Sequence, residues 1–176
     1  MKYLVVTDIH GGLNGTKFIV DEFINGKYDK LLCLGDILYH GPRNDLPSDY
    51  NPKEVIKLLN SISSSILWVR GNCDAEVDEM VLSFKVLESI DMNLNGYKVH
   101  LEHGHHRDLY KGNADIFFFG HTHVPFHDKL GNTLWLNPGS ITLPKENSTK
   151  NFIVFEDNKI TCMDIDKNIV FEEILN

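Results

Sequence analysis

The sequence predicts an α/β fold of the mixed α+β kind, with two β-sheets packed face to face and helices outside. The first half alternates apolar runs with amphipathic stretches, a β-α-β-α-β rhythm that is typical of a parallel sheet. The second half holds short strands joined by tight turns, which is typical of antiparallel pairing. We find no linker, repeat or low-complexity segment, and 176 residues can bury one core. We therefore expect a single domain over residues 1–176.

Five elements are expected in the first half and account for its rhythm. They are strands at 2–7, 31–34 and 66–69, a helix at 16–25, and a second helix that starts at Pro52. Asn14 is the expected N-cap of the first helix, because Asn side chains accept hydrogen bonds from free N–H groups of the first turn. Proline suits the first turn of the second helix. The loop 37–51 is long for a compact domain, which favours a functional role.

The second half is expected to form hairpins and a closing meander. Its elements are strands at 86–93 and 97–102, a short helix near Leu109, a strand at 115–119, a hairpin of 126–130 with 133–136, and strands at 152–156, 159–164 and 170–174. Asn95-Gly96 is a strong signal for a type I′ turn, because both central residues of that turn need positive φ.

The composition excludes several classes of protein. The formal net charge is -8, and an acidic surface disfavours binding to nucleic acid or to an anionic membrane. No apolar stretch reaches the length of about 18 residues that a membrane span needs, and the N-terminus becomes charged too soon for a signal peptide. Three cysteines without a CxxC pair fit a reducing compartment. We expect a cytoplasmic protein with no membrane partner, and we do not expect nucleic acid as a partner.

Side chains of the kind that ligate metals follow five of the expected strands, each at the point where the strand ends and beside a glycine. A single Asp in such a place is usually a turn or a helix cap, and a single His is usually structural. Several donors at five strand ends instead predict one shared site at one edge of the sheet. The seven residues are Asp8, His10, Asp36, Asn72, His103, His121 and His123.

The types of ligand indicate which metals the site would take. Carboxylates, an amide oxygen and imidazoles without a thiolate suit Mn, Fe, Zn, Co or Ni rather than Ca. Seven ligands are too many for one ion but suit two ions that share a carboxylate. Two ions about 3.5–4 Å apart can clamp the attacking and leaving oxygens of a phosphoryl displacement.

The motifs resemble, in order and spacing, the full series of the calcineurin-like metallophosphoesterases, and the stretches around Asp36 and Asn72 are similar to the small bacterial YfcE-type phosphodiesterases. The series is Asp8-x-His10, Gly35-Asp36, Gly71-Asn72-x-Asp74, His103-Gly104-His105 and Gly120-His121-x-His123. The turn Asn137-Pro138-Gly139-Ser140 also resembles a late turn of the family. The resemblance implies a four-layer αββα sandwich of two mixed β-sheets flanked by helices, with a dinuclear metal site at one sheet edge.

The resemblance also implies how the ligands divide between two ions. The first ion would be held by Asp8, His10, Asp36 and His123, and the second by Asp36, Asn72, His103 and His121, so that Asp36 bridges them. We expect two divalent metal ions per chain, with Mn²⁺ first and Zn²⁺, Fe, Co²⁺ or Ni²⁺ as alternatives.

The expected activity is metal-dependent hydrolysis of phosphodiesters, in which two ions lower the pKa of a bridging water and the resulting hydroxide attacks phosphorus in line. One alternative is a phosphomonoesterase or nucleotidase of the same superfamily. The other is a non-catalytic metal-binding scaffold that resembles the retromer subunit of this fold, although such scaffolds tend to lose ligands that this chain keeps. The expected partner is a small phosphodiester or nucleotide-type substrate, and a homo-oligomer is left open.

Several further side chains are candidates for binding or catalysis. Contacts to the substrate phosphate are expected from His40, Arg43 and Asn44, which follow Asp36 on the long loop. Arginine's planar fork suits phosphate oxygens, and the alternative is a solvated loop. The residues expected to take part in catalysis are Asp36, Asn72, Cys73 and Asp74.

Cys73 departs from the pattern of the family. Many relatives that this chain resembles carry histidine there, and that histidine is thought to protonate the leaving oxygen. A thiol, with an ordinary pKa near 8.5, could donate a proton, but a nearby metal charge would favour the thiolate, which cannot. The alternative is that Cys73 only packs beside the site. Asp74 could orient a neighbouring group.

Overall fold

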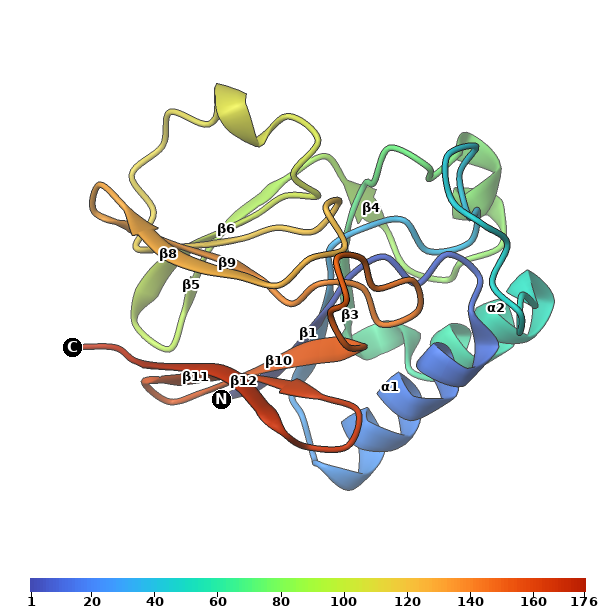
Figure 1. Ribbon diagram of the computed structural model, residues 1–176, viewed down its shortest axis with the longest axis horizontal. Coiled ribbons are helices and arrows are strands. Elements are labelled where there is room, and N and C mark those ends of the chain that lie inside the picture. The colour runs from blue at the N-terminus through green and yellow to red at the C-terminus, as the bar shows by residue number, and fades with distance from the viewer.

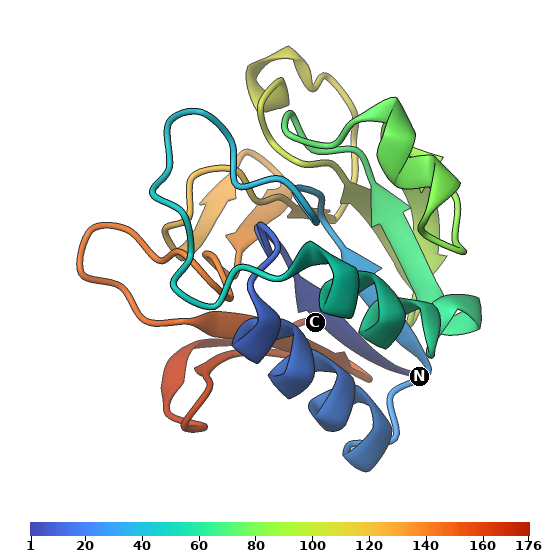
Figure 2. The ribbon, with the colours of Figure 1, turned by 90° about the vertical axis from the view of Figure 1, so that its right-hand side faces the viewer.

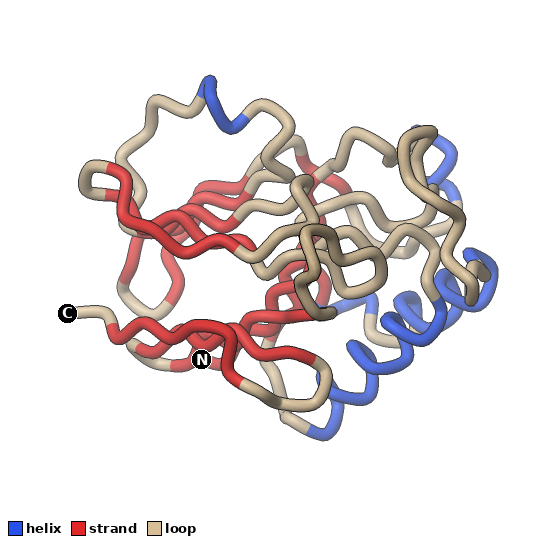
Figure 3. The backbone as a smooth tube through the Cα atoms, in the orientation of Figure 1, coloured by secondary structure: helices blue, strands red, loops and turns tan.

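The computed structural model describes all 176 residues as two β-sheets with two α-helices and three short 3-10 helices (Figures 1 and 3). The strands are β1 Lys2–Val6, β2 Lys30–Cys33, β3 Ile66–Val69, β4 Val86–Leu87, β5 Ile90–Leu94, β6 Tyr97–Leu101, β7 Ile116–Phe118, β8 Phe126–Leu130, β9 Thr133–Asn137, β10 Asn151–Glu156, β11 Lys159–Asp164 and β12 Ile169–Ile174. The helices are α1 Leu13–Asn25, α2 Pro52–Asn60, η1 Ser63–Ser65, η2 Glu76–Met80 and η3 Arg107–Leu109.

The two sheets are both mixed, as expected. The larger sheet has the order β12-β11-β10-β1-β2-β3-β4, in which β1, β2, β3 and β4 run parallel and the closing meander joins β1 through the antiparallel strand β10. The smaller sheet has the order β5-β6-β7-β9-β8, with parallel pairs from β6 to β7 and from β7 to β9.

The central strands β1, β2 and β3 of the larger sheet are largely buried on both faces, because they are apolar at every position after Lys2 and Lys30 at the starts of β1 and β2. Leu4 and Val6 of β1 belong to the core beneath the helices, and Tyr3 and Val5 belong to the core between the two sheets. This division follows from the period of two along a strand, which sends successive side chains to opposite faces. A continuous apolar run is therefore the pattern that such a strand requires.

The outer layers of the sandwich differ from each other. Helices α1 and α2 lie side by side on one face of the larger sheet (Figure 2). The outer face of the smaller sheet is crossed by the loop 102–115, which contains the 3-10 turn η3. Tyr110 of this loop packs against Phe117 and Trp135 of the sheet. The expected sandwich of two mixed sheets is confirmed, and its fourth layer is this loop.

The expected cap of α1 was wrong. The helix begins at Leu13 after Gly12, and Asn14 lies inside its first turn. The free N–H groups of the first turn bond to Asp49, a residue far along the sequence. The Leu13 N–H donates to the Asp49 carbonyl at 3.2 Å, and the Asn14 N–H donates to the Asp49 carboxylate at 2.6 Å. In α2 the cap is local, since the Asn51 side chain accepts from the Glu54 N–H.

The expected strand 86–93 is two strands in different sheets. Val86–Leu87 pairs with β3 in the larger sheet, and Ile90–Leu94 pairs with β6 in the smaller one. The Arg70 guanidinium binds Glu88 at 2.9 Å at the point where the chain crosses over. The expected hairpin turn is confirmed, with φ of 51° at Asn95 and 95° at Gly96.

No helix of the structure has the length and apolar character that a membrane span requires.

Candidate metal centre

The seven predicted ligands meet at one end of the sandwich, because each follows the C-terminal end of a strand. Asp8, His10, Asp36 and Asn72 come after β1, β2 and β3 of the larger sheet, and the three later histidines come after β6 and β7 of the smaller one. Parallel strands end at the same edge, so the two sheets deliver their polar residues to a common place. The loops that carry them lie together on the right of the strands in Figure 1.

Three of these side chains form a tight group around Asp8. Its Oδ1 lies 3.4 Å from His10 Nε2 and 3.3 Å from His123 Nε2, and the two imidazole nitrogens are 3.1 Å apart. The other oxygen, Oδ2, is held by the Thr7 hydroxyl at 2.8 Å and the His121 N–H at 3.0 Å. One carboxylate oxygen therefore fixes the side chain while the other faces the histidines.

A second group forms around Asp36. Its Oδ2 lies 3.3 Å from His103 Nε2 and 3.7 Å from His10 Nε2, so this oxygen faces both groups. Its Oδ1 accepts a hydrogen bond from the Cys73 N–H at 2.8 Å. Asn72 Oδ1 lies 3.2 Å from His103 Nε2, which brings the amide oxygen into the same group. Asp36 Oδ2 is therefore the atom that connects the two groups.

Backbone carbonyls orient three of the histidines. The Nδ1 atoms of His10, His103 and His123 lie 2.6–2.7 Å from the carbonyl oxygens of Tyr39, Leu34 and Leu143. A carbonyl only accepts, so each Nδ1 carries a proton, and in the neutral imidazole each Nε2 keeps its lone pair toward the centre. Metal-binding histidines are held in this way in proteins generally.

The donor set fits a cation. Asp8 Oδ1 is buried without a hydrogen-bond partner, and an unpaired buried carboxylate oxygen is costly. The Nε2 lone pairs of His10 and His123 face each other at 3.1 Å, an arrangement that repels unless positive charge lies between or beside them. Divalent ions bound by these oxygen and nitrogen atoms would relieve both problems.

The electrostatics of the centre favour positive charge. Burial alone would raise the pKa of Asp8, but the imidazoles of His10, His123 and His103, in their protonated forms, outweigh it and hold that pKa well below its ordinary value. Burial would lower the pKa of His103, but its hydrogen bond to Asp36 and the two carboxylate charges raise it to about 9. Both shifts have the same origin, two buried carboxylates that need a cationic neighbour.

The ligand backbone is held in an unusual conformation. Asp8, His10, Asp36, His121 and His123 all have φ between 48° and 69°, the left-handed region that non-glycine residues rarely adopt. Such residues cost roughly 1–3 kcal/mol each and are found where function requires them. The neighbouring glycines allow close approach, since a Cβ on Gly71 would lie 2.0 Å from Asp36 Oδ1.

Asp74 faces away from the ligand groups. Its carboxylate accepts from the N–H groups of Asp36, Ile37 and Gly71 at 2.7–2.9 Å and from Trp68 Nε1 at 3.1 Å. Burial raises its pKa, and the backbone hydrogen bonds offset this only in part. Asp74 therefore acts as a positioning residue that fixes the Asp36 turn.

Cys73 lies at the centre. Its Sγ is within 4.8 Å of ligand atoms of His10 and Asp36, and Asn72 Nδ2 donates to it at 3.2 Å. Burial and the Asp36 charge raise the pKa of the thiol to about 12, and the charge of a bound cation would act in the opposite direction.

A small hollow of about 30 Å³ opens above the ligands. Of the three expected substrate contacts, Arg43 and Asn44 line it and His40 does not. The His40 ring instead packs against Tyr39 and Tyr50, with ring centroids 4.8 and 5.6 Å away. The Asn44 side chain donates to the His40 carbonyl at 2.7 Å and so fixes the loop.

Sequence reasoning missed Lys145, which also lines the hollow. Its N–H donates to the His123 carbonyl at 3.2 Å, and the following residues Glu146 and Asn147 have φ of 53° and 59°. The available signal in the sequence was its place five residues after Ser140, the last residue of the Asn137-Pro138-Gly139-Ser140 turn. In the structure the Ser140 hydroxyl donates to the Asp8 carbonyl at 2.7 Å.

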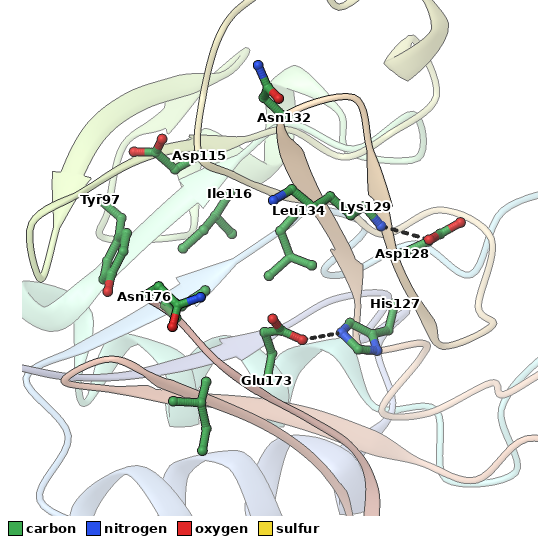
Figure 4. Close-up of a pocket in the computed structure, with 12 residues that line it drawn as sticks. Tyr97, Asp115, Ile116, His127, Asp128, Lys129, Asn132, Leu134, Glu173 and Asn176 are labelled. Carbon is green, nitrogen blue, oxygen red and sulfur yellow. Dashed lines mark hydrogen bonds and ion pairs between the residues drawn. The ribbon is translucent and has the colours of Figure 1, made fainter.

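A larger hollow of about 440 Å³ lies at the other end of the sandwich (Figure 4). It is bordered by the start of β6, β7 and β9 and by the C-terminal strand, with His127 paired to Glu173 at 3.1 Å. None of the seven predicted ligands lines it. The chemistry is therefore concentrated at the small hollow.

A two-sheet sandwich with a cluster of carboxylates and imidazoles at shared strand ends defines a class of protein, the metallohydrolases. The chain belongs to the calcineurin-like phosphoesterase superfamily, whose domain model matches residues 1–159. It is similar to phosphodiesterase YfcE of Escherichia coli (strain K12), with 34% identity over 182 residues that cover 100% of this chain and 99% of the relative. The chain therefore binds divalent metal.

Solved structures agree with this assignment. A structure of YfcE, described as a phosphoesterase from E. coli, superposes with a TM-score of 0.94 at 32% identity and covers 100% of both chains. Wild-type Vps29 complexed with Zn²⁺ from Entamoeba histolytica matches with a TM-score of 0.65 at 22% identity, over 100% of both chains, and shows the fold alone.

Proposed function

We propose that the hollow above Asp36 is the active site of this chain. The chain is a metal-dependent phosphodiesterase, a phosphoric diester hydrolase, as its family and its full-length similarity to phosphodiesterase YfcE indicate. The observation that carries the site assignment is the convergence of the unpartnered Asp8 Oδ1 with the Nε2 atoms of His10 and His123. The monoesterase and scaffold alternatives are not favoured.

Two divalent ions fit the ligand set. We assign Asp8, His10, Asp36 and His123 to one ion and Asp36, Asn72, His103 and His121 to the other, as the family resemblance implies. The supporting geometry is the Asp36 Oδ2 atom, which lies near both His10 and His103. Mn²⁺ is our first choice, because mixed oxygen and imidazole ligands without thiolate suit it.

The chain's own residues bind and orient the substrate. When bound, the ions would activate water and withdraw charge from the phosphoryl group. Arg43 and Lys145, the two cationic side chains of the hollow, would neutralise charge that develops on the phosphoryl oxygens. Asn44 holds the loop that carries Arg43, and Cys73 is placed to meet the leaving oxygen.

We assign a small phosphodiester or nucleotide-type substrate, because the hollow offers two cationic side chains, Arg43 and Lys145, which can contact one phosphate group. We place the enzyme in the cytoplasm, where its three free cysteines would stay reduced.

The first prediction tests the bridging role of Asp36. Asp36→Asn should lower the metal content and abolish hydrolysis of a diester such as bis(p-nitrophenyl) phosphate, because an amide is a poorer bridge than a carboxylate. His123→Ala should lose less, since it removes a ligand of one ion. Metal content is measured by elemental analysis, and the fold by circular dichroism.

Asp45→Asn is the matched control, because Asp45 is an exposed carboxylate on the same loop and should leave both quantities unchanged. An Asp36→Asn protein that holds two ions per chain and turns over like the wild type would refute the assignment.

A further inference from the structure

A third hollow, which we call the outer pocket, lies on the outer face of the smaller sheet. It has a volume of about 570 Å³ and its lining is mainly apolar. The side chains that matter are Tyr110, Thr122, Val124, Phe126, Leu130 and Trp135. Their rings and methyl groups stay open because no α-helix covers this face, and only the loop 102–115 crosses it.

The loop is anchored at one point and leaves the rest open. The Tyr110 ring lies 4.4 Å from the His100 ring and 4.9 Å from Phe117, and its hydroxyl accepts from the Ala114 N–H at 3.0 Å. Phe126 remains 37% exposed and Leu130 47% exposed. The Tyr110 ring therefore forms a wall held by contacts on the loop side, and the pocket is accessible on the side of β8.

The pocket adjoins the metal centre through two chain segments. Thr122 lines the pocket, whereas its neighbours His121 and His123 line the hollow above the ligands. In the same way Glu146 lines the pocket and Lys145 lines the hollow. The 121–123 turn therefore lies between the hollow and the pocket, and a substrate that occupies both must cross this turn.

The chemistry of the lining favours an aromatic ring. Trp135, Phe126 and Tyr110 offer ring faces and edges, which attract other rings beyond simple burial. The Thr122 hydroxyl is already bonded to Val124 and Asn137, so it offers little to a polar group. Arg107 lies with its guanidinium carbon 5.1 Å from the Phe119 ring centroid, which shows that a cationic plane also packs here.

We propose that this pocket binds an aryl substituent of the phosphodiester, the ester arm that is retained on phosphorus. Our assignment places Cys73, which belongs to the 71–74 turn, beside the leaving oxygen. The pocket begins at a different turn, 121–123. The ester arm that is retained on phosphorus therefore lies toward the pocket. This inference rests on the proposed function, because it assumes that phosphate binds in the hollow.

The test holds the leaving group constant and varies the retained arm. Methyl, hexyl and phenyl esters of p-nitrophenyl phosphate are compared by kcat/KM. We expect the phenyl ester to exceed the methyl ester by roughly ten-fold, the scale of one ring contact. Phe126→Ala should remove this preference, and Leu130→Trp should remove it by filling the pocket. Leu109→Ala is the control, because Leu109 is 72% exposed and outside the lining.

The methyl ester should be hydrolysed at wild-type rates by all three variants. A phenyl preference that survives both pocket variants would overturn the proposal, and a hexyl ester as good as the phenyl ester would overturn the aromatic specificity. If wild-type protein hydrolyses none of the esters, the proposed function has failed.

A binding measurement reports on the pocket separately from turnover. Benzylphosphonate, which has no ester bond, is titrated into Zn²⁺-loaded protein while methyl resonances are followed by NMR. Shifts at Val124 and Leu130 that disappear in Phe126→Ala support the pocket, and unshifted methyl groups contradict it.

Discussion

Cys73 is the residue of the centre whose chemistry differs most from the family pattern. Its thiol is held near His10 and Asp36, but a thiol beside metal ions is a poor proton donor because the charge favours thiolate. We predict that the enzyme favours aryl and other low-pKa leaving groups. Cys73→His should raise turnover, most for poor leaving groups, because general acid catalysis contributes roughly 10²–10⁴-fold.

The measurement is the slope of log rate against leaving-group pKa in both proteins. Cys73→Ser serves as the size-matched control, since a hydroxyl supplies no imidazole. If the slope stays the same while both proteins hold their metal, position 73 takes no part in leaving-group protonation.

At this scale the sequence predicted that the seven residues would meet, because each follows a strand and strands of one direction end together. The structure brings all seven to one end of the sandwich, and the role of each as a metal ligand stays a prediction. The place of Lys145 could not be predicted, because it depends on how one loop folds back onto another and has no periodic pattern. For Asp74 an orienting role was expected, and the structure shows which groups it orients, the N–H groups of Asp36, Ile37 and Gly71.

Among the elements, the turn 71–74 is held by Asp74 through four donors from Asp36, Ile37, Gly71 and Trp68. Asp74→Ala leaves these groups without an acceptor, and we predict a loss of metal affinity of roughly 10–100-fold. The measurement is titration of metal into metal-free protein, with Trp68 fluorescence as a second readout of the turn.

Asp78→Asn is the control for that experiment. Asp78 is a buried carboxylate nearby that accepts from the Ala75 N–H at 2.9 Å and touches no ligand turn. Equal losses of metal affinity in the two variants would show that the Asp74 effect is general destabilisation.

Helix α1 is tied to the turn between β11 and β12 by the Lys167–Glu22 ion pair at 2.5 Å. Burial would raise the pKa of Glu22, but Lys167 and Tyr28 lower it. The contribution to stability is therefore present above the unfolded pKa of about 4.3 and is lost as pH falls through the lower folded value. We predict that Glu22→Gln costs about 0.5–1 kcal/mol at pH 7 and much less near pH 3.

Urea unfolding at the two pH values provides the measurement. Glu54→Gln is the control, because the Glu54–Lys57 pair on α2 is exposed and should contribute little at either pH. A Glu22→Gln deficit that grows as the pH falls would contradict the assigned sign.

Most elements could be predicted from periodicity, and the failures share one cause. The strand 86–93 is continuous in its pattern but divides between two sheets, because Val86–Leu87 has β3 as a partner and Ile90–Leu94 has β6. Asn14 has the chemistry of a cap, but Asp49 from a distant loop takes that role. In both cases a long-range contact overrode a correct local preference.

For the whole molecule, the metal centre joins the two sheets. The predicted ligands come from both sheets: one set follows β1, β2 and β3, and the other follows β6 and β7. A bound ion would contact both sets, so bound metal should stabilise the sandwich. Binding to the folded state at 100 times Kd contributes about 2.7 kcal/mol, and we predict a rise in Tm of roughly 5–10 °C.

Differential scanning calorimetry with and without Mn²⁺ measures this rise, and chelator should reverse it. The Asp36→Asn protein is the control and should show a smaller shift. An unchanged Tm at saturating, verified metal would mean that the ions do not hold the sheets together.

The left-handed backbone at five ligand positions has an evolutionary consequence. Glycine or asparagine would fit those positions with less strain, so selection for activity opposes selection for stability there. After a gene duplication, one copy of the protein can lose the selection for hydrolytic activity. In that copy, substitutions should be favoured early at the five ligand positions, Asp8, His10, Asp36, His121 and His123, while the core stays intact. Descendants that keep the sandwich but lose its chemistry are expected to be more stable than their catalytic ancestor.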